Sequence, residues 1–100
     1  MTLIKPDISS FKGNVIRLQI EDDPLDLATA KDIAKKKARE FCADPMLLSF
    51  YMGETGEYYP KAECSFLERP AWIVFAESRG GDMMIDINDG QYVFIYLPLP

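Results

Sequence analysis

The sequence predicts a small α+β domain, in which a twisted antiparallel sheet carries one main helix on one face. Three observations lead to this prediction. Residues 27–43 place apolar side chains at helical spacing, residues 71–97 contain three β-rich runs separated by turns, and residues 14–21 alternate between apolar and polar side chains. One helix followed by a meander, with an extra amino-terminal strand, is a typical α+β arrangement.

The length of 100 residues predicts one domain over residues 1–100. With 48% apolar and 27% charged residues, the chain has the composition of a globular protein. We therefore expect a core that needs neither a metal ion nor a disulfide to hold it together.

Residues Asn14–Glu21 have the period of a half-buried strand. The helix follows over about Leu27–Ala43, with Asp26 as the expected N-cap and Asp23 before Pro24 as the competing start. Its apolar stripe consists of Leu27, Ala30, Ile33, Ala34, Ala38 and Phe41. The Asp44-Pro45 pair should end the helix, because a residue before proline avoids the helical conformation.

The predicted strands of the second half are Leu47–Tyr51, Ala71–Glu77, Asp82–Ile87 and Gln91–Leu97. The last three form an antiparallel meander. Its turns are Gly80-Gly81 and Asn88-Asp89-Gly90, whose residue types tolerate the positive φ that tight hairpins need. The path of residues 53–69 is not predictable from the pattern.

Both faces of this predicted sheet are apolar, whereas one helix can cover only one of them. In the last strand, Val93 and Ile95 lie on one face, and Tyr92, Phe94 and Tyr96 on the other. We expect the second face to be covered either by residues 46–69 or by another subunit, which would make the protein a homodimer through the sheet face.

The candidate binding residues follow from the same pattern. A groove on the second face, lined by Trp72, Tyr92 and Tyr96, would suit a ligand, although aromatic residues in strands more often belong to the core. Glu77 and Arg79 flank the Gly80-Gly81 turn, where Arg79 could hold an anionic ligand or simply pair with a carboxylate of the turn.

Charge argues against some classes of partner. The net charge of −5 disfavours nucleic acid and anionic membranes, both of which need a basic surface. Residues 31–39 carry five cations and one anion, which indicates a solvated helix face or a docking surface for an acidic partner. The first residues do not resemble a signal peptide, so we expect a cytoplasmic protein with reduced cysteines.

Few catalytic arrangements remain open. The chain has no histidine, which removes the usual nucleophilic triads and the commonest zinc ligand, and we expect no catalytic residues, no metal and no cofactor. The sequence does not establish the function. Its lack of catalytic arrangements favours a noncatalytic binding or protein-interaction module. The alternative is a small enzyme that uses carboxylates and a thiol, centred on Glu63, Cys64, Glu77 and Arg79.

Parts of the chain resemble a small uncharacterised prokaryotic family of about one hundred residues, known only as a domain of unknown function. The likeness covers about residues 26–98 and is carried by residues 47–51, 63–64, 69–72, 76–81 and 85–96. It implies an α+β fold and no assigned activity. More faintly, the order of the predicted elements is similar to that of PepSY-type domains, which implies a noncatalytic binding or inhibitory module.

Overall fold

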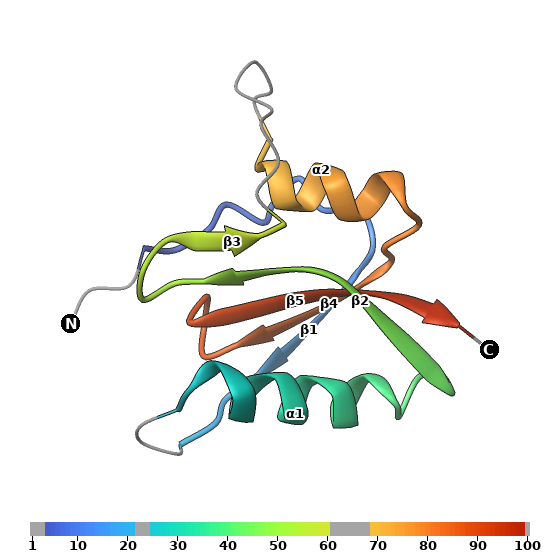
Figure 1. The fold of residues 1–100 in the computed structure, drawn as a ribbon, viewed down its shortest axis with the longest axis horizontal. Helices are drawn as coiled ribbons and strands as arrows, with labels where there is room; N and C mark the ends of the chain where they lie inside the picture. Colours follow the sequence, from blue (N-terminus) through green and yellow to red (C-terminus); the bar gives the residue numbers. More distant parts are fainter. Residues whose placement is uncertain (1–3, 22–24, 61–68, 100) are drawn as a thin grey trace.

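The computed structural model describes residues 4–21, 25–60 and 69–99, and Figure 1 shows a mixed sheet between two helices. The fold is therefore α+β, as predicted. In chain order the elements are β1 (Asn14–Leu18), α1 (Leu27–Ala38), β2 (Asp44–Met52), β3 (Glu57–Tyr59), α2 (Ala71–Ser78), β4 (Met83–Ile87) and β5 (Tyr92–Leu99).

The strands lie in the order β1-β4-β5-β2-β3. The pairs β4–β5, β5–β2 and β2–β3 are antiparallel, but β1 runs parallel to β4. The prediction of a wholly antiparallel sheet was therefore wrong for the amino-terminal strand. Its parallel register pairs Asn14 with Met83 and Leu18 with Ile87, and the Asn14 N–H donates to the Asp82 carbonyl at 2.8 Å where the strand enters the sheet. A Cβ atom at Gly13 would lie 2.4 Å from that carbonyl oxygen, so the close approach requires glycine.

Helix α1 begins as predicted and ends earlier. The Asp26 carboxylate accepts a hydrogen bond from the Thr29 N–H at 2.8 Å, which confirms Asp26 as the N-cap. The helix stops at Ala38 instead of near Ala43, because tight turns within residues 37–41 lead the chain into β2 at Asp44. Phe41 consequently leaves the predicted stripe, and 59% of it is exposed.

Three alanines bring α1 close to the sheet. Ala30, Ala34 and Ala38 are spaced one turn apart and are all fully buried. They pack against residues of β4 and β5 in one apolar cluster. Small side chains at these positions set the distance between helix and sheet.

The segment predicted as a strand over Ala71–Glu77 forms helix α2, so this prediction was wrong. The Gly80-Gly81 pair does not turn a hairpin but ends the helix. The Gly81 N–H bonds the Ala76 carbonyl, the Gly80 N–H bonds the Glu77 carbonyl, and Gly80 has a positive φ of 89°. This is the Schellman arrangement, which glycine favours because it carries no Cβ. The order of elements therefore differs from the PepSY-like order, which has a strand at this position, because Trp72 lies in a helix.

Each helix covers one face of the sheet, with α1 below it and α2 above it in Figure 1. The first apolar cluster joins α1 to Tyr92, Phe94 and Tyr96, and the second joins α2 to Val93 and Ile95. The predicted division of β5 between the two faces is therefore confirmed. Among the described residues, the apolar face that suggested a homodimer is covered by α2 together with Phe11, while residues 61–68 lie outside the described part of the chain.

We expect Ala34→Leu to destabilise the protein by about 1–3 kcal/mol, because a larger side chain must push α1 away from the sheet. Urea unfolding followed by circular dichroism measures the change. Ala28→Leu is the matched control, since Ala28 lies on the exposed side of the same helix. Equal stability of the two variants would contradict the close packing described for α1.

Candidate functional site

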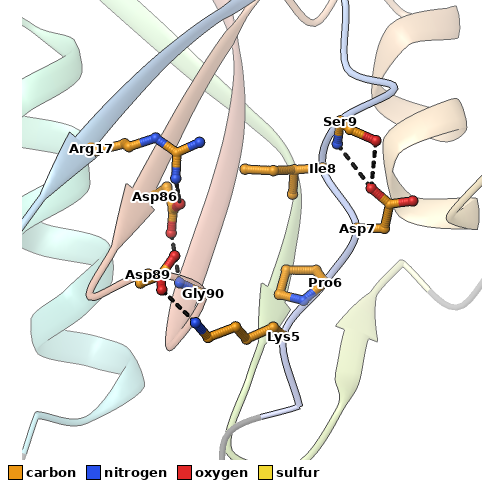
Figure 2. A pocket seen from close by; sticks show the side chains of 9 residues that line it. All are labelled: Lys5, Pro6, Asp7, Ile8, Ser9, Arg17, Asp86, Asp89 and Gly90. Atoms are coloured by element: carbon orange, nitrogen blue, oxygen red, sulfur yellow. Dashed lines mark hydrogen bonds and ion pairs between the residues drawn. The ribbon is translucent and has the colours of Figure 1, made fainter.

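A polar pocket of about 300 Å³ lies between the amino-terminal segment and the sheet (Figure 2). One wall is the extended segment 5–9, and the other is formed by Arg17 of β1 and Asp86 of β4. The turn between β4 and β5 contributes Asp89 and Gly90. The pocket thus combines segments from both ends of the chain on the α2 side of the sheet.

Asp86 is the buried charged residue of this pocket, with only 2% of its surface exposed. One carboxylate oxygen accepts from an Arg17 guanidinium nitrogen at 3.0 Å, and the other accepts from the Gly90 N–H at 2.8 Å. Arg17 reaches it because the two residues are direct partners in the parallel β1–β4 register. Burial raises the pKa of Asp86, although the hydrogen bond from Gly90 and the charge of Arg17 act in the opposite direction.

The turn from residue 88 to residue 90 is the tight hairpin that the sequence predicted. Asn88, Asp89 and Gly90 have positive φ angles of 55°, 52° and 98°. This conformation directs the Gly90 N–H at Asp86 and leaves the Asp89 carboxylate at the rim, 2.6 Å from the Lys5 ammonium group. The bond from Lys5 lowers the pKa of Asp89. The turn therefore positions both carboxylates of this end of the pocket.

Most N–H groups of the Arg17 guanidinium have no hydrogen-bond partner among the described residues. Its side chain is 64% exposed, and its one hydrogen bond to a described residue is the bond to Asp86. Figure 2 shows the guanidinium over Asp86, across the pocket from Ile8. The remaining N–H groups are thus available to a bound molecule at a site where the position of the guanidinium is already fixed.

Asp7 and Ser9 form the far wall. The Asp7 carboxylate accepts from both the Ser9 hydroxyl at 2.6 Å and the Ser9 N–H at 3.1 Å. These bonds lower the pKa of Asp7. The contact stabilises the local turn of the segment, and in Figure 2 the carboxylate lies away from Arg17 and Asp86.

The predicted aromatic groove is not assembled. Tyr92 and Tyr96 lie on the α1 face, where the Tyr92 hydroxyl donates to the Leu25 carbonyl at 3.1 Å and burial raises the pKa of Tyr96. Trp72 lies on the opposite face and stacks on Tyr51 with 5.4 Å between ring centroids. The sheet separates Trp72 from the two tyrosines, and all three side chains are buried.

Glu77 and Arg79 lie at the end of α2 but have separate partners. Glu77 forms an ion pair with Arg69 and accepts a hydrogen bond from the Lys12 N–H at 3.1 Å, which ties α2 to the amino-terminal segment. The Arg79 guanidinium lies over the Phe75 ring, with its central carbon 3.7 Å from the ring centroid. Neither residue lines the pocket. The other two residues of the alternative enzyme site, Glu63 and Cys64, lie outside the described residues.

Sequence reasoning missed Arg17 and Asp86 as site residues. Asp86 interrupts an otherwise apolar strand, and Arg17 is a charged residue at one of the polar positions of the alternating amino-terminal strand. A charge in each of two strands indicates a cross-strand pair, but only their parallel register brings these two charges together.

None of the helices in the described part of the chain has the length and apolar character needed to span a membrane. Within the same residues, no three side chains of the histidine, cysteine, aspartate or glutamate type are grouped as a metal site would require.

Comparison with known proteins gives a family and a fold. The model of a family described as a domain of unknown function (DUF5619) matches residues 13–96, which include the parallel strand β1. The crystal structure of AF1514, a novel protein from Archeoglobus fulgidus DSM 4304, is similar with a TM-score of 0.76 and 28% identity. The match covers 89% of this chain and 98% of that one. No curated protein matches the chain.

We expect Asp86 to stabilise the protein more at acid pH than at neutral pH. Because its pKa is raised in the folded state above the ordinary value of 3.8, its stabilising effect is complete below that value and is lost as the pH rises through the folded pKa. The difference in unfolding free energy between the wild type and Asp86→Asn should therefore grow as the pH falls from about 7 towards about 4. Urea titrations at several pH values measure it.

Asp89→Asn is the control of opposite sign. The pKa of Asp89 is lowered, so its contribution is present above the ordinary value of 3.8 and is lost as the pH falls through the folded pKa. A difference for Asp86→Asn that shrinks with acid, as the one for Asp89→Asn should, would refute the assigned direction.

Proposed function

The chain belongs to the DUF5619 family, a domain of unknown function, and we propose that it is a noncatalytic binding module whose site is the pocket around Arg17 and Asp86. The observation that carries this proposal is the exposed guanidinium of Arg17, held in place by a buried carboxylate. A group that is fixed before the ligand arrives loses little conformational freedom on binding.

The ligand we infer is a small molecule with one carboxylate and a low net charge. A guanidinium with free donors matches a carboxylate in two-pronged geometry. The pocket also contains Asp7, Asp86 and Asp89 against Lys5 and Arg17, so it repels a highly charged anion. A volume of about 300 Å³ is at the lower end for ligand pockets, which favours a molecule of few atoms.

Two features favour binding over catalysis. A carboxylate with a raised pKa is a common general acid or base, but both oxygens of Asp86 already accept hydrogen bonds. The described cysteine, Cys42, lies on the α1 side of the sheet, and its thiol is 3.6 Å from the Ala38 carbonyl. Cys42 therefore does not line the pocket, and Cys64, the nucleophile of the alternative enzyme, lies outside the described residues. A cytoplasmic location stays a prediction.

We test the proposal with three probes added to ¹⁵N-labelled protein: glycine, acetate and inorganic phosphate. Glycine and acetate should shift the amide signals of Gly90 and the Nε signal of Arg17, and phosphate should shift them less. Arg17→Met should weaken binding of these carboxylates by about tenfold or more, because a charge-assisted hydrogen bond is lost.

Lys36→Met is the matched control, because Lys36 lies on α1, where it pairs with Asp32 at 3.0 Å. It should leave binding unchanged. Absence of any shift at Gly90 with all three probes, or an equal loss in both variants, would rule out this pocket as the carboxylate site.

A further inference from the structure

Strand β1 forms one border of the sheet, and its backbone alternates between the sheet and the outside. The Asn14 N–H donates to the Asp82 carbonyl, and the Leu18 carbonyl accepts from the Asn88 N–H, both at 2.8 Å. In a parallel pair, the N–H and C=O of one residue point to the same side, and those of the next residue point away. The backbone N–H and C=O groups therefore point to β4 at Asn14, Ile16 and Leu18. At Val15 and Arg17 they point away from the sheet.

The side chain of Asn88 continues this alternation beyond the end of β1. Its oxygen accepts from the Ile20 N–H at 2.7 Å, and its nitrogen donates to the Ile20 carbonyl at 3.0 Å. Ile20 is thus held inward as if by a further strand residue. With Leu18 and Ile20 both held inward, the alternation turns the backbone groups of Gln19 outward like those of Val15 and Arg17, and Glu21 is the next position of this series.

We propose that this edge pairs with the same edge of a second copy of the chain, in antiparallel orientation. Two sheets would then join into one continuous sheet across a twofold axis. An exposed run of backbone donors and acceptors is a ready template for such pairing, and twofold dimers are the commonest oligomers. This pairing rests on the backbone of the edge and not on the ligand pocket, although Arg17 belongs to both.

The exposed edge of β1 is complementary to a second copy of itself. With Gln19 on the twofold axis, Arg17 of each copy lies opposite Glu21 of the other, which pairs opposite charges. The same register places Leu18 opposite Ile20, and both are half-buried apolar side chains on the α1 face. Placing Arg17 on the axis would instead oppose like charges. The strand therefore favours one antiparallel register with its own copy.

Native mass spectrometry and light scattering over a concentration series test the proposal on the full chain. The wild type should form a dimer. Gln19→Pro removes an N–H that faces outward and leaves every donor that bonds β4 intact, so the protein should become a monomer. Gln19→Thr keeps the N–H and should stay dimeric.

A second variant tests the proposed dimer interface if Gln19→Pro does not fold. Glu21→Lys keeps all edge N–H groups but places a cation opposite Arg17, so the dimer dissociation constant should rise about tenfold. Lys36→Glu, on α1, serves as the charge-reversal control and should have little effect. A wild type that is monomeric throughout the series, or pairs only with a different protein, would overturn the proposal. A dimer unaffected by both edge variants would also overturn it.

Discussion

Strands β4 and β5 are buried on both faces, and this constraint determines the placement of the other elements. Alternate residues of β5 point to α1 and to α2, so the sheet requires a helix on each side. The three buried alanines let α1 approach one face. On the other face, Trp72 and Ile73 of α2 are joined by Phe11 of the amino-terminal segment. The segment that completes this face is also the outer wall of the polar pocket.

Asp86 is the exception in these apolar strands, and its burial gives the sheet a defined register. A buried carboxylate is costly unless it is paired and hydrogen-bonded. Arg17 and Gly90 supply these partners, one from β1 and one from the turn. If β1 slipped by one residue, Arg17 would point to the α1 face and Asp86 would lose its cation. The pair therefore stabilises the correct alignment of β1 and also holds the guanidinium toward the pocket.

The local features of the fold could be predicted from the sequence, and the distant ones could not. Asp26 has a recognisable capping chemistry, the 88–90 turn has the residue types of a tight hairpin, and β5 alternates clearly. The segment 71–77 failed because its first six residues are all apolar, so its period fits a strand and a helix equally. Pro70 before this segment and Gly80 after it are residues typical of the two ends of a helix, and they indicate the secondary structure better than the apolar pattern does.

The candidate pocket around Arg17 and Asp86 could not be predicted from the sequence for a related reason. Their residue type makes aromatic side chains candidates for a binding groove, yet burial on opposite faces of the sheet keeps Trp72 apart from Tyr92 and Tyr96. Arg17 and Asp86 meet only through a parallel pairing between segments from the two ends of the chain, which no local pattern encodes. The likeness to an uncharacterised family was correctly recognised, and it implied the fold without assigning a function.

The pairing of β1 with β4 also has a consequence for the order of folding. The partners Arg17 and Asp86 are 69 positions apart, whereas β4 and β5 are joined by a tight turn. Contacts between distant positions form slowly, because a long loop must close before they contribute stability. During synthesis, β1 therefore leaves the ribosome well before β4 and has no partner in the sheet until β4 has emerged. Docking of β1 is thus the step at which the amino-terminal segment and the polar pocket take shape together.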